Sequence, residues 1–258
     1  MTKSADESAG TIRVERDGPI AWMIFAHARR RNAMTLDMWR AVPPTCAELA
    51  TDSEVRVVIL RGEGERAFVA GADISQFQTQ RTGDSGSDYE HTTASAYDAI
   101  EGIGKPVLAM IHGFCVGGGL ALALSADVRY ASDDAVFALP PAKLGIGYSA
   151  AGINKLVDLV GPSVTKEIVY TADAHEAHTA LRWGLVNHVR PKSELETFVR
   201  EQAAVMASRA PLSQQAAKLA VAGDPEAATV INSCFTSHDY AEGVAAFMEK
   251  RSPKFRGS

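Results

Sequence analysis

The sequence predicts an α/β fold, with a core of strands and helices followed by a helical C-terminal region. Two observations support this prediction. Short apolar runs rich in branched residues recur before residue 140, as in "VRVVILRG" (55–62) and "KPVLAMIHG" (105–113), and such runs are typical of strands that are buried on both faces. After Pro191 the pattern becomes helical. Strands early and helices late indicate an α/β core with a helical tail.

The first elements are predicted to be a hairpin, a helix and two buried strands. Residues 12–28 hold two β-rich runs around Asp17-Gly18, a dipeptide that favours tight turns. A helical stretch near Thr35–Ala50 leads to the first buried strand. Residues 75–91, "SQFQTQRTGDSGSDYEH", are polar and contain glycine. We expect a surface loop there, between the two buried strands.

The later elements are predicted to be further strands and then helices. Strands are expected in "DVRYAS" (127–132) and "AVFALP" (135–140). The helical runs "SELETFVREQAAVMASRA" (193–210) and "SHDYAEGVAAFMEKR" (237–251) are separated by Pro211 and Gly223-Asp224-Pro225, residues that end helices. We therefore predict a core over residues 11–192 and a helical region over residues 193–258.

Composition and charge exclude several classes of function. A net charge of -5 gives no basic surface of the kind that nucleic acid binding demands. Cys46, Cys115 and Cys234 show no CxxC spacing, so neither a disulfide framework nor a zinc site is expected. The polar N-terminus lacks the apolar segment of a signal peptide, and no run approaches the ~20 apolar residues of a membrane span. We expect a cytoplasmic protein without metal and without a membrane partner.

Two glycine-rich junctions between a strand and a following helix are the candidate site. The first is "AFVAGADI" (67–74), with a helix expected from Asp73, and the second is "HGFCVGGGLALAL" (112–124), with Gly117-Gly118-Gly119 before an apolar helix. Backbone N–H groups at a helix start have no partner within the helix. Two such donors can hold one oxyanion. Alternatively, the three glycines only allow a tight turn or close helix packing.

Six motifs occur together in a set order: "AFVAGADI", "HGFCVGGGLALAL", "DVRYAS", "LGIGYSAAG", "TADAHEAHTALRWGLVNHV" and "AEGVAAFMEKRSPKFRG". They resemble the crotonase, or enoyl-CoA hydratase/isomerase, superfamily over about residues 12–256. The resemblance implies a spiral of ββα repeats and a C-terminal helical region that builds a homotrimer or a homohexamer. It implies an acyl-CoA thioester substrate and no separate cofactor, since coenzyme A is part of the substrate. The thioester oxygen is then expected to bind the N–H groups of Ala72 and Gly118.

The resemblance also points to missing acids. Hydratases of the superfamily carry glutamates at two positions where this chain has Ala121 and Pro141, and neither residue moves a proton. Hydration by the two-glutamate route is therefore expected to be absent or very slow. Tyr148 stands where methylmalonyl-CoA decarboxylases of the superfamily have a tyrosine, a partial similarity that breaks down at Ala72 and Ala121. Decarboxylation needs no base and would suit such a pocket, although Tyr148 could also be a ring with a purely structural role.

Coenzyme A is an anion, so the resemblance implies basic contacts to its phosphates. The expected contacts are Arg29, Arg30 and Arg31 in "RRRNAMT", Ala70 at the end of the first glycine junction, and Lys254 in the C-terminal stretch, which also holds Lys250 and Arg251.

Other polar residues are weaker candidates. His175 and His178 in "HEAH" lack the spacing of a zinc motif and are expected on a helix surface. Asp73 is either a helix cap or a general base. Turn or salt-bridge roles are expected for Asp127, Asp133 and Asp134.

Three functions are compatible with the sequence. The first is an enzyme that acts through a thioester enolate, by decarboxylation or isomerisation. The second is a hydratase with a nonstandard acid, such as Asp88, Glu90 or His91 of the 75–91 segment. The third is a catalytically silent acyl-CoA binder.

Overall fold

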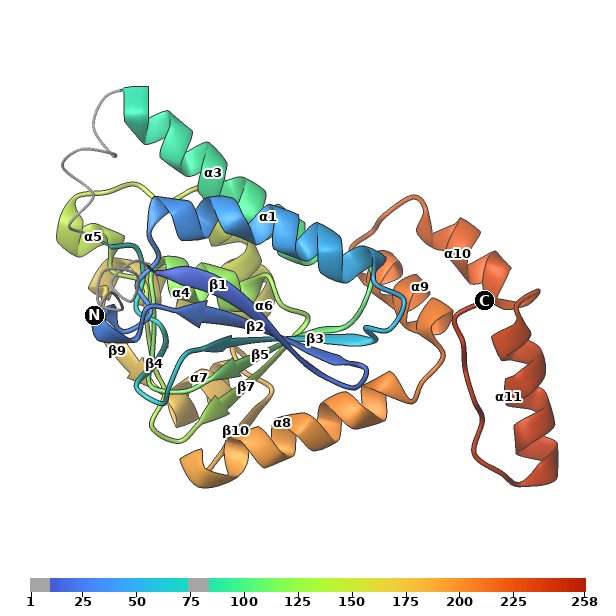
Figure 1. The fold of residues 1–258 in the computed structure, drawn as a ribbon. Helices are drawn as coiled ribbons and strands as arrows, with labels where there is room; N and C mark the ends of the chain where they lie inside the picture. The colour runs from blue at the N-terminus through green and yellow to red at the C-terminus, as the bar shows by residue number, and fades with distance from the viewer. Residues whose placement is uncertain (1–9, 74–83) are drawn as a thin grey trace, which may run out of the picture.

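A computed structural model describes residues 10–73 and 84–258 of the chain. The first of its two sheets contains the predicted hairpin and both predicted buried strands (Figure 1). In spatial order its strands are β1 (Thr11–Asp17), β2 (Ile20–Ala26), β3 (Val57–Gly62), β5 (Val107–Ile111), β7 (Val128–Ser132) and β10 (His188–Arg190). β1 and β2 pair antiparallel, and every later neighbour pairs parallel.

The second sheet is built from short strands, of which β4, β6 and β8 each follow a strand of the first sheet. Its order is β4 (Ala67–Val69), β6 (Phe114–Val116), β8 (Val136–Ala138) and β9 (Ala174–Glu176). The chain passes from β3 to β4, from β5 to β6 and from β7 to β8, and a helical segment follows each pair. This repeat of two strands and a helix confirms the predicted α/β spiral.

Helices cover both faces of the first sheet. The helical elements are η2 (Ala28–Arg30), α1 (Leu36–Thr51), α3 (Asp84–Glu101), α4 (Gly118–Leu124), α5 (Pro141–Leu144), α6 (Ala150–Thr171), α7 (Ala177–Trp183), α8 (Lys192–Ala207), α9 (Pro211–Val221), α10 (Ala227–Cys234) and α11 (His238–Glu249). α1 begins where the sequence predicts, because the Thr35 side chain accepts a hydrogen bond from the backbone N–H of Met38.

β2 shows why the sheet needs helices on both sides. All seven of its residues are buried, and alternate residues point to opposite faces. Met23 and Phe25 join the core that contains Trp39 of α1. Trp22 and Ile24 join a second core with Leu195, Val199 and Ala203 of α8. The unbroken apolar pattern of this strand therefore reflects burial from two sides.

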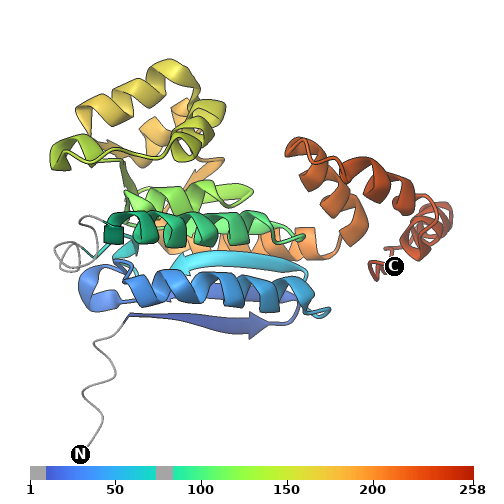
Figure 2. The same ribbon diagram turned by 90° about the horizontal axis from the view of Figure 1, so that it is seen from above.

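The last three helices stand to one side of the layered strands and helices (Figure 2). α8 packs against the first sheet, whereas α9, α10 and α11 extend beyond it. The C-terminal segment after α11 returns toward the core, where the Arg56 guanidinium donates a hydrogen bond to the Phe255 carbonyl. Within the described ranges, no helix combines the length and apolar character that a membrane crossing requires.

Two local predictions were wrong. Residues 84–91 of the expected surface loop belong to α3, because Tyr89 is buried and its hydroxyl accepts a hydrogen bond from the Trp39 indole at 3.0 Å. This tertiary contact outweighs the loop-like composition of the segment. Residues 75–83 of that loop lie outside the described residues. The "HEAH" motif is not one helix surface, since His175 lies in β9 with its ring against Trp183, while His178 lies in α7.

Candidate active site

The two glycine-rich junctions meet because β4 and β6 are parallel neighbours. The carboxyl ends of parallel strands lie at the same edge of a sheet, so the segments that follow β4 and β6 emerge side by side. The approach is close at Gly71, where a Cβ atom would lie 3.1 Å from the Val116 carbonyl oxygen. Gly71 also has a φ of 102°, a backbone conformation that favours glycine.

The N–H of Ala72 points away from the segment at Met34, which pairs with residues 71–73. The N–H of Met34 donates to the Gly71 carbonyl at 2.8 Å, and the N–H of Asp73 donates to the Met34 carbonyl at 2.9 Å. Backbone groups of successive extended residues point to opposite sides, so the Ala72 N–H faces the other way. Among the described residues it has no hydrogen-bond partner.

The three glycines at the start of α4 have different structural roles. Gly117 has a φ of 55° and donates its N–H to the Ala138 carbonyl. At Gly119 a Cβ atom would lie 2.0 Å from the Val69 carbonyl oxygen, so α4 packs directly on β4. Gly118 between them begins α4, and the first N–H groups of a helix have no partner within it. The turn and packing roles therefore hold for Gly117 and Gly119, and Gly118 presents its N–H in front of the helix.

A cavity of about 260 Å³ lies at this junction. It brings together four of the predicted site residues, namely Ala70, Ala72, Gly118 and Tyr148. Ala121 and Pro141, the positions without acids, line the same cavity. The predicted basic contacts Arg29, Arg30, Arg31 and Lys254 do not line it.

Two carboxylates of α3 also line the cavity. They are Glu90, which is one of the candidate acids predicted from the sequence, and Asp98, which is not among those candidates. Both residues are exposed, so they stand at the rim. Asp88 and His91 do not line the cavity.

The sequence does not predict this wall, because the composition at the start of α3 favours a loop. Besides Tyr89, five residues of α3 line the cavity: Glu90, Thr93, Ala94, Tyr97 and Asp98. Their spacing of three, four, seven and eight is that of one helix face. This helical periodicity is the feature of the sequence that could have predicted the wall.

Tyr148 lies in the segment between α5 and α6. It directly precedes Ser149, the N-cap of α6, whose side chain accepts a hydrogen bond from the Gly152 N–H. The ring is half-buried and packs against the main core. A Cβ atom on Gly152 would lie only 2.6 Å from the ring, so the glycine makes room for the tyrosine.

The three arginines lie beside the end of β4. The Arg31 carbonyl accepts a hydrogen bond from the Ala70 N–H at 3.1 Å. The Arg31 guanidinium sits 4.5 Å from the Phe114 ring centre, and the Arg30 guanidinium is 3.9 Å from the Asp73 carboxylate. All three arginines are exposed next to the cavity wall.

Lys254 and the other predicted polar residues lie elsewhere. Lys254 follows α11, which lies at the opposite end of the molecule from β4 (Figure 1), and its backbone N–H donates to Glu242. Asp127 pairs with Lys218, and Asp134 pairs with Lys192. Asp133 accepts a hydrogen bond from the Lys192 N–H. These contacts confirm the turn and salt-bridge roles of the three aspartates.

Among the described residues, no three His, Cys, Asp or Glu side chains form a group that could hold a metal ion.

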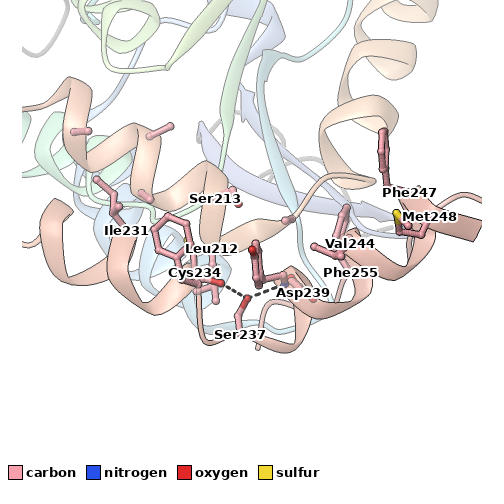
Figure 3. Close-up of a pocket in the computed structure, with 17 residues that line it drawn as sticks. Leu212, Ser213, Ile231, Cys234, Ser237, Asp239, Val244, Phe247, Met248 and Phe255 are labelled. Carbon is pink, nitrogen blue, oxygen red and sulfur yellow. Dashed lines mark hydrogen bonds between the residues drawn. The ribbon is translucent and has the colours of Figure 1, made fainter.

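A second and larger hollow of about 660 Å³ lies among the C-terminal helices (Figure 3). Apolar side chains of α9, α10 and α11 line most of it, including Leu212, Ile231, Val244, Phe247 and Met248. Phe255 of the C-terminal segment closes one side. It contains none of the predicted catalytic residues.

Comparison with known proteins shows similarity along nearly the whole chain. The family model for enoyl-CoA hydratase/isomerase matches residues 15–258. The chain is 36% identical to the short-chain-enoyl-CoA hydratase of Clostridium acetobutylicum, over 92% of this chain and 94% of that protein. It is 34% identical to the carnitinyl-CoA dehydratase of Salmonella typhi, over 96% and 98% of the two chains. The crystal structure of an enoyl-CoA hydratase/carnithine racemase from Magnetospirillum magneticum superposes with a TM-score of 0.91 at 32% identity, covering 97% of both chains.

Proposed function

The chain belongs to the enoyl-CoA hydratase/isomerase family, and on that premise we propose that it binds an acyl-CoA thioester in the cavity beside α4 and converts it through an enolate. One observation carries the proposal. The parallel neighbours β4 and β6 bring the N–H groups of Ala72 and Gly118 to one cavity. Neither N–H has a partner among the described residues.

Two such donors favour charge on the thioester oxygen. Removing a proton or a carboxylate from the carbon next to the thioester carbonyl creates an enolate, whose negative charge rests largely on that oxygen. Donors that are already in place stabilise this charge without reorganisation. In other enzymes, loss of one such donor lowers turnover by about 10²–10³-fold.

The residues beside the oxyanion site favour decarboxylation or isomerisation over hydration. Ala121 and Pro141 line the cavity at the positions where the resemblance expects acids. In a decarboxylation the bond between the α-carbon and the carboxylate breaks, its electron pair enters the enolate, and CO₂ leaves without a base. Tyr148 is the proposed polar contact to the acyl group, because it lines the same cavity as Ala121 and Pro141, which carry no acid.

Hydration with a nonstandard acid is the second candidate. Glu90 and Asp98 line the cavity and could carry a proton to or from a water molecule. Similar proteins named as hydratases, at 36% and 33% identity, also support this candidate.

The coenzyme A part of the substrate is proposed to lie along the arginine segment. Arg29, Arg30 and Arg31 are exposed beside Ala70 at the cavity wall, where their charges can meet the phosphates. Lys254 follows α11, which lies at the opposite end of the molecule from β4 (Figure 1). We therefore propose that Lys254 serves coenzyme A bound to a neighbouring copy.

The experiment is a comparison of two substrates. The protein is incubated with methylmalonyl-CoA, following CO₂ release, and with crotonyl-CoA, following loss of the enoyl absorbance. Release of CO₂ with little loss of enoyl absorbance is the expected result. Rapid loss of enoyl absorbance supports the hydratase instead. Binding of both thioesters without turnover of either would contradict an enzymatic function.

A further inference from the structure

The hydroxyl of Tyr97 lies beside Gly118. A Cβ atom on Gly118 would lie 3.5 Å from this oxygen and 3.0 Å from the Trp39 ring. A Cβ atom and the amide nitrogen of the same residue are about 2.5 Å apart, so the Tyr97 oxygen lies within about 6 Å of the Gly118 nitrogen. Tyr97 also lines the cavity.

The Tyr97 hydroxyl lies near the N-terminal end of α4. Bonds from Cα to Cβ in a helix tilt toward the helix N-terminus, and the first N–H groups point the same way. Tyr97 approaches Gly118 from its Cβ side, at the first residue of α4. The phenol oxygen therefore lies beside the first residue of α4, and Tyr97 and Gly118 line the same cavity.

The Tyr97 ring is held in place by buried aromatic neighbours. It meets the Trp39 ring edge-on, with ring centres 5.4 Å apart and an interplanar angle of 82°. Trp39 is fully buried, and its indole N–H donates to the Tyr89 hydroxyl at 3.0 Å. Such an arrangement keeps the Tyr97 oxygen near one position, as a group that moves a proton requires.

We propose that Tyr97 is a catalytic residue that delivers a proton to the enolate carbon, an inference that rests on the proposed function. The enolate electrons form a C–H bond to the carbon next to the thioester carbonyl, and the O–H bond of Tyr97 breaks. The phenolate then takes a proton from water, which restores the residue. Decarboxylation and hydration both end with this protonation, so the role does not depend on which of the two occurs.

Tyr97 differs from the other proton-bearing side chains of the cavity by its place beside Gly118. Tyr148 also lines the cavity and is the proposed contact to the acyl group. Ala121 carries no proton, and Glu90 and Asp98 are exposed at the rim. The Tyr89 hydroxyl faces the indole of Trp39. Within the described part of the chain, Tyr97 is the phenol that lies beside Gly118.

The test is Tyr97→Phe, which keeps the ring and its packing on Trp39 and removes only the hydroxyl. Turnover is measured in D₂O with methylmalonyl-CoA and with crotonyl-CoA, and the configuration of the deuterium at C2 of the product is determined by NMR. We expect kcat to fall by about 10²-fold, with KM changed less than threefold. The deuterium, placed in one configuration by the wild type, should appear in both, since water would then protonate the free enolate. A purely structural role would not alter this configuration.

The matched control is Tyr170→Phe, which removes a phenol hydroxyl from a residue that is 73% exposed on α6. It should behave as the wild type, and both variants should unfold at the wild-type temperature. If Tyr97→Phe keeps the wild-type kcat and deuterium configuration, the role of Tyr97 is wrong while the proposed function stands. If the wild type converts neither thioester, the proposed function fails, and the inference fails with it.

Discussion

Among single residues, Ala121 and Pro141 matter most for the proposed chemistry, because they give the cavity no acid or base at these two positions. Both line it, on α4 and at the first position of α5, and neither side chain carries a proton. The proposed oxyanion site next to them consists of backbone N–H groups and does not use their side chains. The missing acids should therefore be restorable without rebuilding the rest of the site.

The double change Ala121→Glu and Pro141→Glu should create or raise hydration of crotonyl-CoA. Both carboxylates would enter the cavity that the N–H groups of Ala72 and Gly118 face, and acid–base catalysis typically contributes ~10²–10⁴-fold. The rate is measured by loss of enoyl absorbance. The matched control is the pair Ala121→Gln and Pro141→Gln, which adds similar volume without an acid. Wild-type hydration at about 10 per second or faster would show that another residue already carries the proton.

His112 makes the stability of the protein depend on pH. Burial lowers the pKa of His112 to about 4, and the positive charges of Arg61 and Lys192 act in the same direction. Its Nε2 has no hydrogen-bond partner among the described residues. The folded state therefore favours the neutral ring.

The sign of the pH effect follows from the two states. An unfolded histidine has a pKa of about 6.5, so between pH 6.5 and 4 the unfolded chain binds a proton that the folded chain does not. The free energy of unfolding should fall by on the order of 3 kcal/mol as pH is lowered through this range. Urea unfolding at several pH values measures it. His112→Gln should flatten the dependence, and the exposed His178→Gln should not. An equal slope in all three proteins would contradict the assignment.

At the scale of elements, the packing of α4 on β4 holds the site together. A Cβ atom at Gly119 would lie 2.0 Å from the Val69 carbonyl oxygen, so Gly119→Ala must push the helix away from the strand. We expect a loss of about 1–3 kcal/mol in the free energy of unfolding, measured by urea denaturation. Gly147→Ala, where an added Cβ meets nothing within 4 Å, is the control. Equal stability of the two variants would contradict this view of the junction.

The same elements show what the sequence could predict. The two junctions were predictable because their geometry is encoded in glycines, as the φ of 55° at Gly117 and the close approach at Gly119 illustrate. The wall made by α3 was not predicted. Residues 84–91 are rich in serine, glycine and aspartate, which favour turns, and the contact between Tyr89 and Trp39 that helps to order them joins residues 50 positions apart. Asp98 and Tyr97 were therefore not connected to the cavity from sequence alone.

At the scale of the whole molecule, we propose that the C-terminal helices mediate assembly into a trimer or a hexamer. Phe247 is 82% exposed and Met248 is 76% exposed beside the apolar hollow of Figure 3. Large apolar patches of this kind mark interfaces in soluble proteins. Light scattering should find three or six copies at micromolar concentration. Phe247→Asp should reduce the assembly, whereas Val14→Asp on the edge strand β1 should not. A stable wild-type monomer would contradict the proposal.

The hydrogen bonds proposed from the N–H groups of Ala72 and Gly118 to the thioester oxygen should lower the stretching frequency of the bound carbonyl, and this frequency is their most sensitive measure. An acyl-CoA labelled with ¹³C at the thioester carbonyl is bound to the wild type, to Gly118→Pro and to Gly118→Ala, and the carbonyl stretch is read by isotope-edited infrared spectroscopy. Proline fits the first position of a helix but has no N–H, and alanine adds a Cβ atom while it keeps the N–H. We expect a lower frequency for the wild-type complex than for free thioester, a smaller shift with Gly118→Ala, and loss of most of the shift with Gly118→Pro. A bound carbonyl at the frequency of free thioester, or one equally shifted in Gly118→Pro, would contradict the proposed hydrogen bonds.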